Sequence, residues 1–166
     1  MDQAQGAIDA ARAAGADRYA TTEYSAATDA LKNANAAVAA RDYRLALNHA
    51  LESREHAQNA ARDGADAKAR VRVEVDRALS DITALVTQGR TRLAAAERAR
   101  VPSRLLERPA NDLTAADADL QKAGEAVAAG DYLRASAALE GLRERVEKAL
   151  AAIDDAMPAR PPRPRR

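Results

Sequence analysis

The chain has 166 residues and a net charge of +1, and 47% of its residues are hydrophobic although Cys, Phe and Trp are absent. This length suits one domain or two small modules, and the lack of cysteine excludes disulfides, thiolate nucleophiles and thiolate metal sites. Alanine supplies 46 residues; it favours helices but adds little apolar area to a core. The composition therefore predicts thin helical bundles packed across alanine faces. With no continuous apolar run of about 18 residues, we expect no transmembrane helix.

The chain opens with two predicted helices, at about residues 3–14 and 22–40. Gly15 is suited to end the first helix in a left-handed conformation. Thr21 or Thr22 is a candidate N-cap of the second, because either hydroxyl can accept a hydrogen bond from a free backbone N–H.

A third, long helix is predicted from Asp42 to Arg98, with no proline to interrupt it. Apolar and small residues recur every three, four or seven positions, which keeps one stripe on one face. The expected inner positions are Leu47, Ala50, Arg54, Ala57, Ala61, Gly64, Val71, Val75, Ala78, Ile82, Leu85, Gly89 and Ala96. Gly64 is the soft point, since glycine costs about 1 kcal/mol in a helix interior. The helix either continues through Gly64 or kinks and breaks there.

Prolines divide the remainder of the chain. A loop is expected over 101–109, followed by a fourth helix over about 111–129 with Asn111 as its N-cap. A fifth helix is expected over about 131–156, ended by Pro158.

One hairpin turn occurs twice, 89 residues apart. Asp42 and Asp131 are each placed to cap the helix that follows the turn. Gly130 can adopt a left-handed conformation without a Cβ clash, whereas Arg41 at the same place is expected to be strained. The two copies read Ala-Val-Ala-Ala-Arg-Asp-Tyr over 37–43 and Ala-Val-Ala-Ala-Gly-Asp-Tyr over 126–132. Repetition at a fixed spacing is typical of repeated supersecondary units.

These elements predict an all-α fold in which five helices form two antiparallel three-helix units that share one long central helix. The expected shape is elongated, spectrin-like or tetratricopeptide-like. The units are predicted over residues 1–63 and 64–157, joined through the helix 42–98. The Arg/Pro-rich residues 158–166 are expected to form an extended, disordered tail.

Two resemblances accompany this pattern. Residues 41–46 and 130–135 resemble the Gly-Asp-Tyr-x-x-Ala turn of tetratricopeptide hairpins, although the bulky residues and closing proline of that family are missing. Residues 4–62, with Ala-Arg-Ala-Ala-Gly-Ala at 11–16 and the alanine-rich helix before the Asp-Tyr turn, resemble a bacterial helical family known only as a domain of unknown function, number 4398 in its series. That resemblance implies a small envelope protein or lipoprotein with an export signal upstream, and it implies no activity.

His49, Glu52 and His56 share one helix face and are the only metal candidates in the sequence. Their spacing could present ligands to Zn²⁺. However, they follow the expected inner positions by two residues, which places them toward solvent, and no further strong ligand is nearby. We therefore predict a polar face and no metal or other cofactor.

No constellation of catalytic residues is found. Neighbouring carboxylates such as Asp117 and Asp119 diverge on a helix, and there is no phosphate-binding loop or activated nucleophile motif. Tyr43 and Tyr132 are expected to cover the hairpin ends with their rings, with ligand stacking as the alternative. We expect a protein that is not an enzyme and has no small-molecule substrate.

The remaining candidate contact residues are Arg160, Arg163, Arg165 and Arg166. We expect a non-catalytic interaction or structural protein that binds a protein partner or itself, for example as a homodimer. The alternative is a binding module whose basic tail contacts nucleic acid, anionic lipid or an acidic protein. The near-neutral body and the lack of Phe and Trp argue against nucleic acid. Periplasmic or outer-membrane location, with a lipid anchor, is expected if a signal or lipobox precedes Met1, and cytoplasmic location otherwise.

Overall fold

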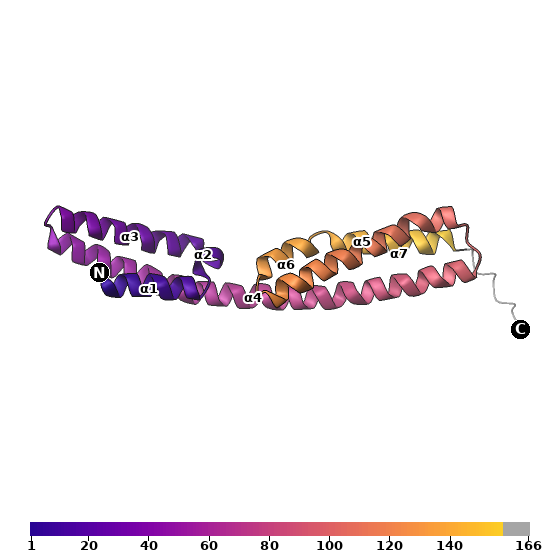
Figure 1. Cartoon of the computed structure of the whole chain (residues 1–166), viewed down its shortest axis with the longest axis horizontal. Coiled ribbons are helices and arrows are strands. Elements are labelled where there is room, and N and C mark those ends of the chain that lie inside the picture. The colour runs from indigo at the N-terminus through magenta and orange to yellow at the C-terminus, as the bar shows by residue number, and fades with distance from the viewer. Residues whose placement is uncertain (158–166) are drawn as a thin grey trace, which may run out of the picture. The chain divides into compact units, whose positions relative to one another are not determined.

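The computed structural model describes residues 1–157, and all regular secondary structure within them is helical. The helices are α1 (Asp2–Ala13), α2 (Ala16–Tyr19), α3 (Thr21–Ala39), α4 (Tyr43–Arg98), α5 (Ser103–Ala128), α6 (Tyr132–Leu139) and α7 (Leu142–Ala156) (Figure 1). The prediction of an all-helical chain with one long helix is confirmed. No helix in this part of the chain combines the length and the apolar character that crossing a membrane requires.

The described residues divide into two compact units, and the boundary between Val71 and Arg72 lies inside α4. Unit 1 contains α1, α2, α3 and the beginning of α4. Unit 2 contains the remainder of α4 together with α5, α6 and α7. The long helix passes through Gly64 without a break, which resolves the alternative that the sequence left open.

Unit 1 is built around small side chains. Two layers of its core are Ile8 with Ala27 and Ala57, and Ala11 with Ala16 and Ala60. The one buried polar residue among the described residues, Ser53, donates from Oγ to the carbonyl oxygen of Ala27 at 2.8 Å. Because alanine and serine project little beyond the backbone, the helices of this unit can approach one another closely.

Gly64 permits the closest of these approaches. A Cβ added at this position would lie 2.9 Å from the Cα of Ala16 in α2. Such a contact involves backbone, which cannot rotate away. The glycine that propensity marks as a weak point of the helix is therefore required by packing between α4 and α2.

Unit 2 has a core of larger aliphatic side chains. Helix α5 packs against both α6 and α7, and α4 contributes its second half. The buried aliphatic residues are Val75, Ile82, Val86, Val101, Leu106, Leu113, Leu139, Leu142, Val146, Leu150 and Ile153.

Buried positions in the two units correspond at the same 89-residue spacing as the repeated turn. Residue pairs in which both members are buried include Ala27 and Ala116, Ala34 and Ala123, Ala37 and Ala126, Ala46 and Ala135, Ala57 and Val146, and Ala60 and Ala149. Where buried pairs differ, unit 2 has the larger residue: Ser53 corresponds to Leu142 and Gly64 to Ile153. The two cores thus have buried residues at equivalent positions, but the buried side chains of unit 2 are larger at several of them.

The expected loop over 101–109 is wrong. Helix α5 begins at Ser103 and contains Pro109, which is buried. Proline removes one backbone hydrogen bond from a helix, but here its ring is packed in the core. Asn111 consequently lies inside α5 and does not cap it.

The expected single helix over 131–156 is also wrong. It is interrupted after Leu139, and Gly141 adopts a left-handed conformation with φ 68° before α7 begins. Two smaller differences concern the first unit. The short helix α2 has no counterpart among the expected helices, and the N-cap of α3 is Ala20, so neither Thr21 nor Thr22 caps it. Gly15 does adopt the expected left-handed conformation, with φ 87°.

Candidate functional site

The repeated turns are held by the two aspartates. Asp42 accepts a hydrogen bond through Oδ1 from the backbone N–H of Leu45 at 2.9 Å, and Asp131 accepts one from the N–H of Arg134 at 3.2 Å. The residues before them are both left-handed, with φ 64° at Arg41 and φ 74° at Gly130. An arginine in this region is strained, since its Cβ crowds the backbone. These residues therefore have a structural role in the turns.

The tyrosines after the two turns differ in their surroundings. Tyr43 is 68% exposed, so its ring does not cover the end of the hairpin as expected, whereas Tyr132 is half-buried. Elsewhere in unit 1, Tyr24 packs against the alanine layers, and its hydroxyl accepts a hydrogen bond from Arg12 Nε at 2.8 Å. The exposure of Tyr43 distinguishes this aromatic side chain from the others.

His49, Glu52 and His56 do not converge. His49 Nδ1 lies 2.8 Å from Glu52, while His56 Nδ1 lies 2.8 Å from Glu23 of α3. Each imidazole thus has its own carboxylate partner. Among residues 1–157, no group of three or more His, Cys, Asp or Glu side chains is placed to hold a metal ion.

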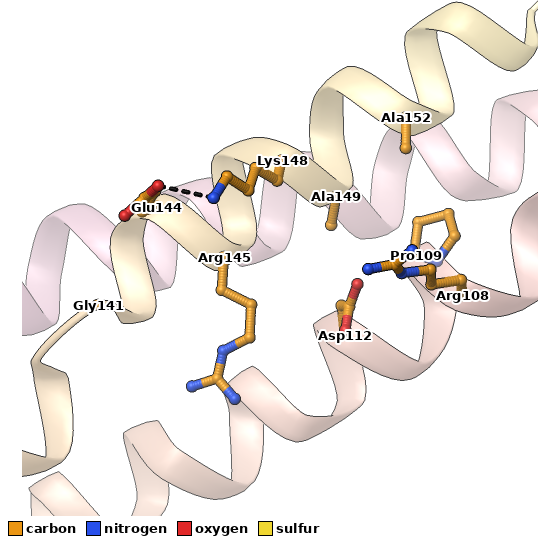
Figure 2. A pocket seen from close by; sticks show the side chains of 9 residues that line it. All are labelled: Arg108, Pro109, Asp112, Gly141, Glu144, Arg145, Lys148, Ala149 and Ala152. Atoms are coloured by element: carbon orange, nitrogen blue, oxygen red, sulfur yellow. Dashed lines mark ion pairs between the residues drawn. The ribbon is translucent and has the colours of Figure 1, made fainter.

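A groove of about 410 Å³ lies between α5 and α7 in unit 2. Figure 2 shows Ala149 and Arg145 of α7 pointing toward α5, where Arg108 and Asp112 lie, while Lys148 reaches along α7 to Glu144. Lys148 pairs with Glu144 at 2.7 Å, and this hydrogen bond holds the pKa of Glu144 below its ordinary value. Charges of both signs alternate along an open groove, which is typical of a solvated helix interface.

Asp119 of unit 2 is paired with two basic residues. It accepts a hydrogen bond from Lys122 Nζ at 3.1 Å and another from Arg145 Nη2 at 2.7 Å. The hydrogen bond from Lys122, followed by that from Arg145, lowers the pKa of Asp119, while burial opposes the shift. Because both donors are on the protein itself, this cluster fastens α7 to α5.

The surface that departs from ordinary packing is a stripe on the first turns of α4. Tyr43, Leu47 and Leu51 are 68%, 60% and 48% exposed. They are spaced by four residues and therefore lie on one face of the helix. We call these three residues the leucine stripe. Three exposed apolar side chains on one helix face make this surface the candidate site of the described chain.

Among the described residues, α1 lies beside α4 only from about Arg54 onward. Along α4, Arg54 contacts Gln3, and Ala57 packs with Ile8. Earlier residues of α4 therefore lie beyond the N-terminal end of α1, where unit 1 consists of the α3–α4 hairpin alone (Figure 1). The leucines continue the side of α4 that α1 covers further along.

The corresponding hairpin of unit 2 has polar residues at these positions. Leu47 corresponds to Ser136 and Leu51 to Glu140 at the 89-residue spacing. Ser136 and Glu140 line a groove beside α4 together with Val75. A third helix thus reaches the end of this hairpin.

The expected inner stripe is correct for part of α4 and wrong at its beginning. Gly64, Val75, Ile82 and Gly89 are among the buried residues, but Leu47 is not. In the first turns, Ala57 is buried as expected, but Ala46, Ser53 and Ala60 are also buried, and each lies one residue before an expected inner position. The sequence feature that could have revealed the buried face is the match between Ala46 and Ala135, which occupy the same position after the two copies of the turn. Because leucine is more hydrophobic than alanine, Leu47 was predicted to be the inner residue in place of Ala46.

The candidate tail residues, Arg160, Arg163, Arg165 and Arg166, lie outside the described residues, and binding through them stays a prediction from the sequence. Residues 1–76 match the sequence model of a family described as a domain of unknown function (DUF4398). No curated protein and no solved structure matches the chain. The resemblance inferred from the sequence is thereby confirmed for the N-terminal part of the chain.

Proposed function

We propose that this chain, which matches the DUF4398 family over residues 1–76, acts as a non-catalytic helical interaction protein of the bacterial envelope. Its two three-helix units, built on the shared long helix α4, present helix faces to a protein partner or to another copy of the chain. The location in the envelope rests on what the family resemblance implies, including an export signal encoded upstream.

The observation that supports this proposal is the leucine stripe. A monomeric protein of this small size has few large aliphatic residues to bury, yet Leu47 and Leu51 are 60% and 48% exposed. Full burial of an exposed leucine contributes roughly 1.5–3 kcal/mol, so covering the exposed part of each of these leucines contributes about half of that amount. A partner that covers both leucines removes their exposed apolar area from water, and this burial favours binding.

The grooves support binding of a macromolecule over a small substrate. Their linings, such as Arg108, Asp112 and Lys148 between α5 and α7, are open and alternate in charge (Figure 2). Small-molecule sites are usually concave and mostly apolar, with a few polar groups that converge.

A photo-reactive amino acid placed at Leu47 tests the proposal in cells that express the full-length gene. We expect irradiation to cross-link Leu47 to a protein in the envelope fraction. The matched control is the same amino acid at Ser136, which occupies the equivalent position of the other hairpin and should give little product. Absence of any cross-link from Leu47, Leu51 and Tyr43 would show that the proposed interaction function is wrong.

A further inference from the structure

We propose that the leucine stripe is the contact surface of an antiparallel homodimer, in which the first turns of α4 from two copies pack against each other. This inference rests on the proposed interaction function and names the partner: a second copy of this chain. The stripe is exposed in the described chain, where 60% of Leu47 and 48% of Leu51 is accessible.

The positions of the leucines suit pairing about a two-fold axis. Leu47 and Leu51 are one turn apart, and the midpoint between them is residue 49. When two copies of α4 run antiparallel about this point, Leu47 of each copy faces Leu51 of the other. A two-fold interface uses the same patch on both copies, so the patch must complement itself in this way.

The charged residues beside the stripe are consistent with the same two-fold axis, near residue 49. Arg44 and Glu55 are eleven residues apart, about three helical turns, and therefore lie on the same side of the stripe. Both are exposed, and neither has a hydrogen bond or ion pair with any residue of the described chain. Their midpoint falls between residues 49 and 50, within one residue of the leucine midpoint.

Antiparallel packing about this point consequently satisfies the apolar and the charged residues together. Arg44 of each copy is placed opposite Glu55 of the other, which gives two ion pairs at the rim. A parallel two-fold pair would instead place this side of the two copies on opposite rims of the interface, so Arg44 and Glu55 could not pair. A partner with a surface of one sign would leave either Arg44 or Glu55 opposed by its own charge.

The hairpin of unit 2 provides an internal comparison. At the positions of Leu47 and Leu51 it has Ser136 and Glu140, and α4 lies beside it. Unit 2 therefore has polar residues at the positions where unit 1 has the two leucines. In the proposed dimer, α4 of the second copy would cover Leu47 and Leu51.

Sedimentation velocity of the full chain, over a wide range of concentrations, tests the proposal. We expect a monomer–dimer equilibrium whose Kd rises by about 100-fold or more in Leu47→Glu and Leu51→Glu, because each substitution occurs twice in the dimer. The matched control is Val73→Glu, which introduces the same charge at a position of α4 that is 67% exposed and should leave the Kd unchanged. Circular dichroism verifies that every variant keeps its helix content.

Charge reversal tests the orientation. Arg44→Glu and Glu55→Arg should each weaken the dimer, roughly three- to tenfold, and the double variant should restore it. The chain has no cysteine, so disulfide trapping has no background. Oxidation of a mixture of Leu47→Cys and Leu51→Cys should yield mainly the mixed disulfide.

Three results would overturn the inference: a wild-type chain that is monomeric at every concentration, a dimer unaffected by Leu47→Glu, or a Leu47→Cys homodisulfide that exceeds the mixed one. None of them contradicts the interaction function itself. If photo-reactive Leu47 cross-links in cells to a different protein while the purified chain stays monomeric, the interaction function holds and the homodimer is wrong.

Discussion

The two hairpins of this protein place their large aliphatic side chains on opposite sides. In unit 2, Leu142 and Ile153 are buried, while Ser136 and Glu140 are exposed. In unit 1 the equivalent buried positions have serine and glycine, and the equivalent outer positions have leucines. One backbone pattern thus supports either a core held by side-chain volume or a core held by close helix approach. Only the second arrangement leaves large apolar residues available for a partner.

The largest expected effect concerns side-chain volume in the core. Leu142→Ala should destabilise unit 2 by about 2–5 kcal/mol, because the cavity left behind cannot be filled by a rigid core. The equivalent change in unit 1, Ser53→Ala, should cost only about 1 kcal/mol, since it removes one hydrogen bond to a carbonyl that is also part of a helix. Hydrogen exchange at increasing denaturant concentration measures the free energy of unfolding of each unit in both variants. Equal costs would mean that the two cores are not held in different ways.

Gly64 tests the close approach in unit 1. Gly64→Ala should destabilise this unit by about 1–3 kcal/mol, because the new methyl group meets the backbone of Ala16. In unit 2, Gly89→Ala should cost less, since its Cβ meets the end of the Leu113 side chain, which can shift.

The control for these substitutions is Gly6→Ala. Position 6 lies inside α1 with nothing within 4 Å of an added Cβ, so the alanine should stabilise the chain by up to about 1 kcal/mol through helix propensity. Thermal unfolding compares the three variants. A stabilising Gly64→Ala would contradict the role of helix approach in unit 1.

The repeated turns offer a reciprocal exchange. Arg41→Gly should stabilise the first turn by about 1 kcal/mol, because it relieves the left-handed strain of arginine. Gly130→Ala should destabilise the second turn by a similar amount. Both can be read from the denaturant midpoint. If Arg41→Gly has no effect, the strain at Arg41 is offset by an interaction of its side chain.

The smallest expected effect is electrostatic and specific to unit 2. The pKa of Asp119 is lowered in the folded chain by its hydrogen bonds from Lys122 and Arg145, so its ionised form stabilises the fold above the ordinary aspartate pKa. That stabilisation is lost as the pH falls through the folded pKa, below about pH 4. Asp119→Asn should therefore cost roughly 0.5–1 kcal/mol at neutral pH and almost nothing near pH 2. A difference between the two proteins that persists at low pH would exclude ionisation as its cause.

Some elements of this protein were predictable because their causes are local. Alanine content and the absence of proline from 42–98 predicted the long helix, and Gly15, Gly130 and the two turn aspartates predicted the ends of helices. Where the local rule failed, packing decided. Pro109 stands inside α5 because its ring is buried in unit 2, and Gly141 interrupts a helix that propensity alone would continue.

The sequence by itself determined that the chain is helical, that it contains one long helix, and that a single turn motif occurs in two places. Only the tertiary structure decided which face of the long helix is buried. Periodicity defines a stripe, but an alanine stripe and a leucine stripe one residue apart fit the same period. The choice between them depends on which helices lie alongside and how far they extend. In the described chain, α1 lies beside α4 from about Arg54 onward, and Leu47 and Leu51 are exposed.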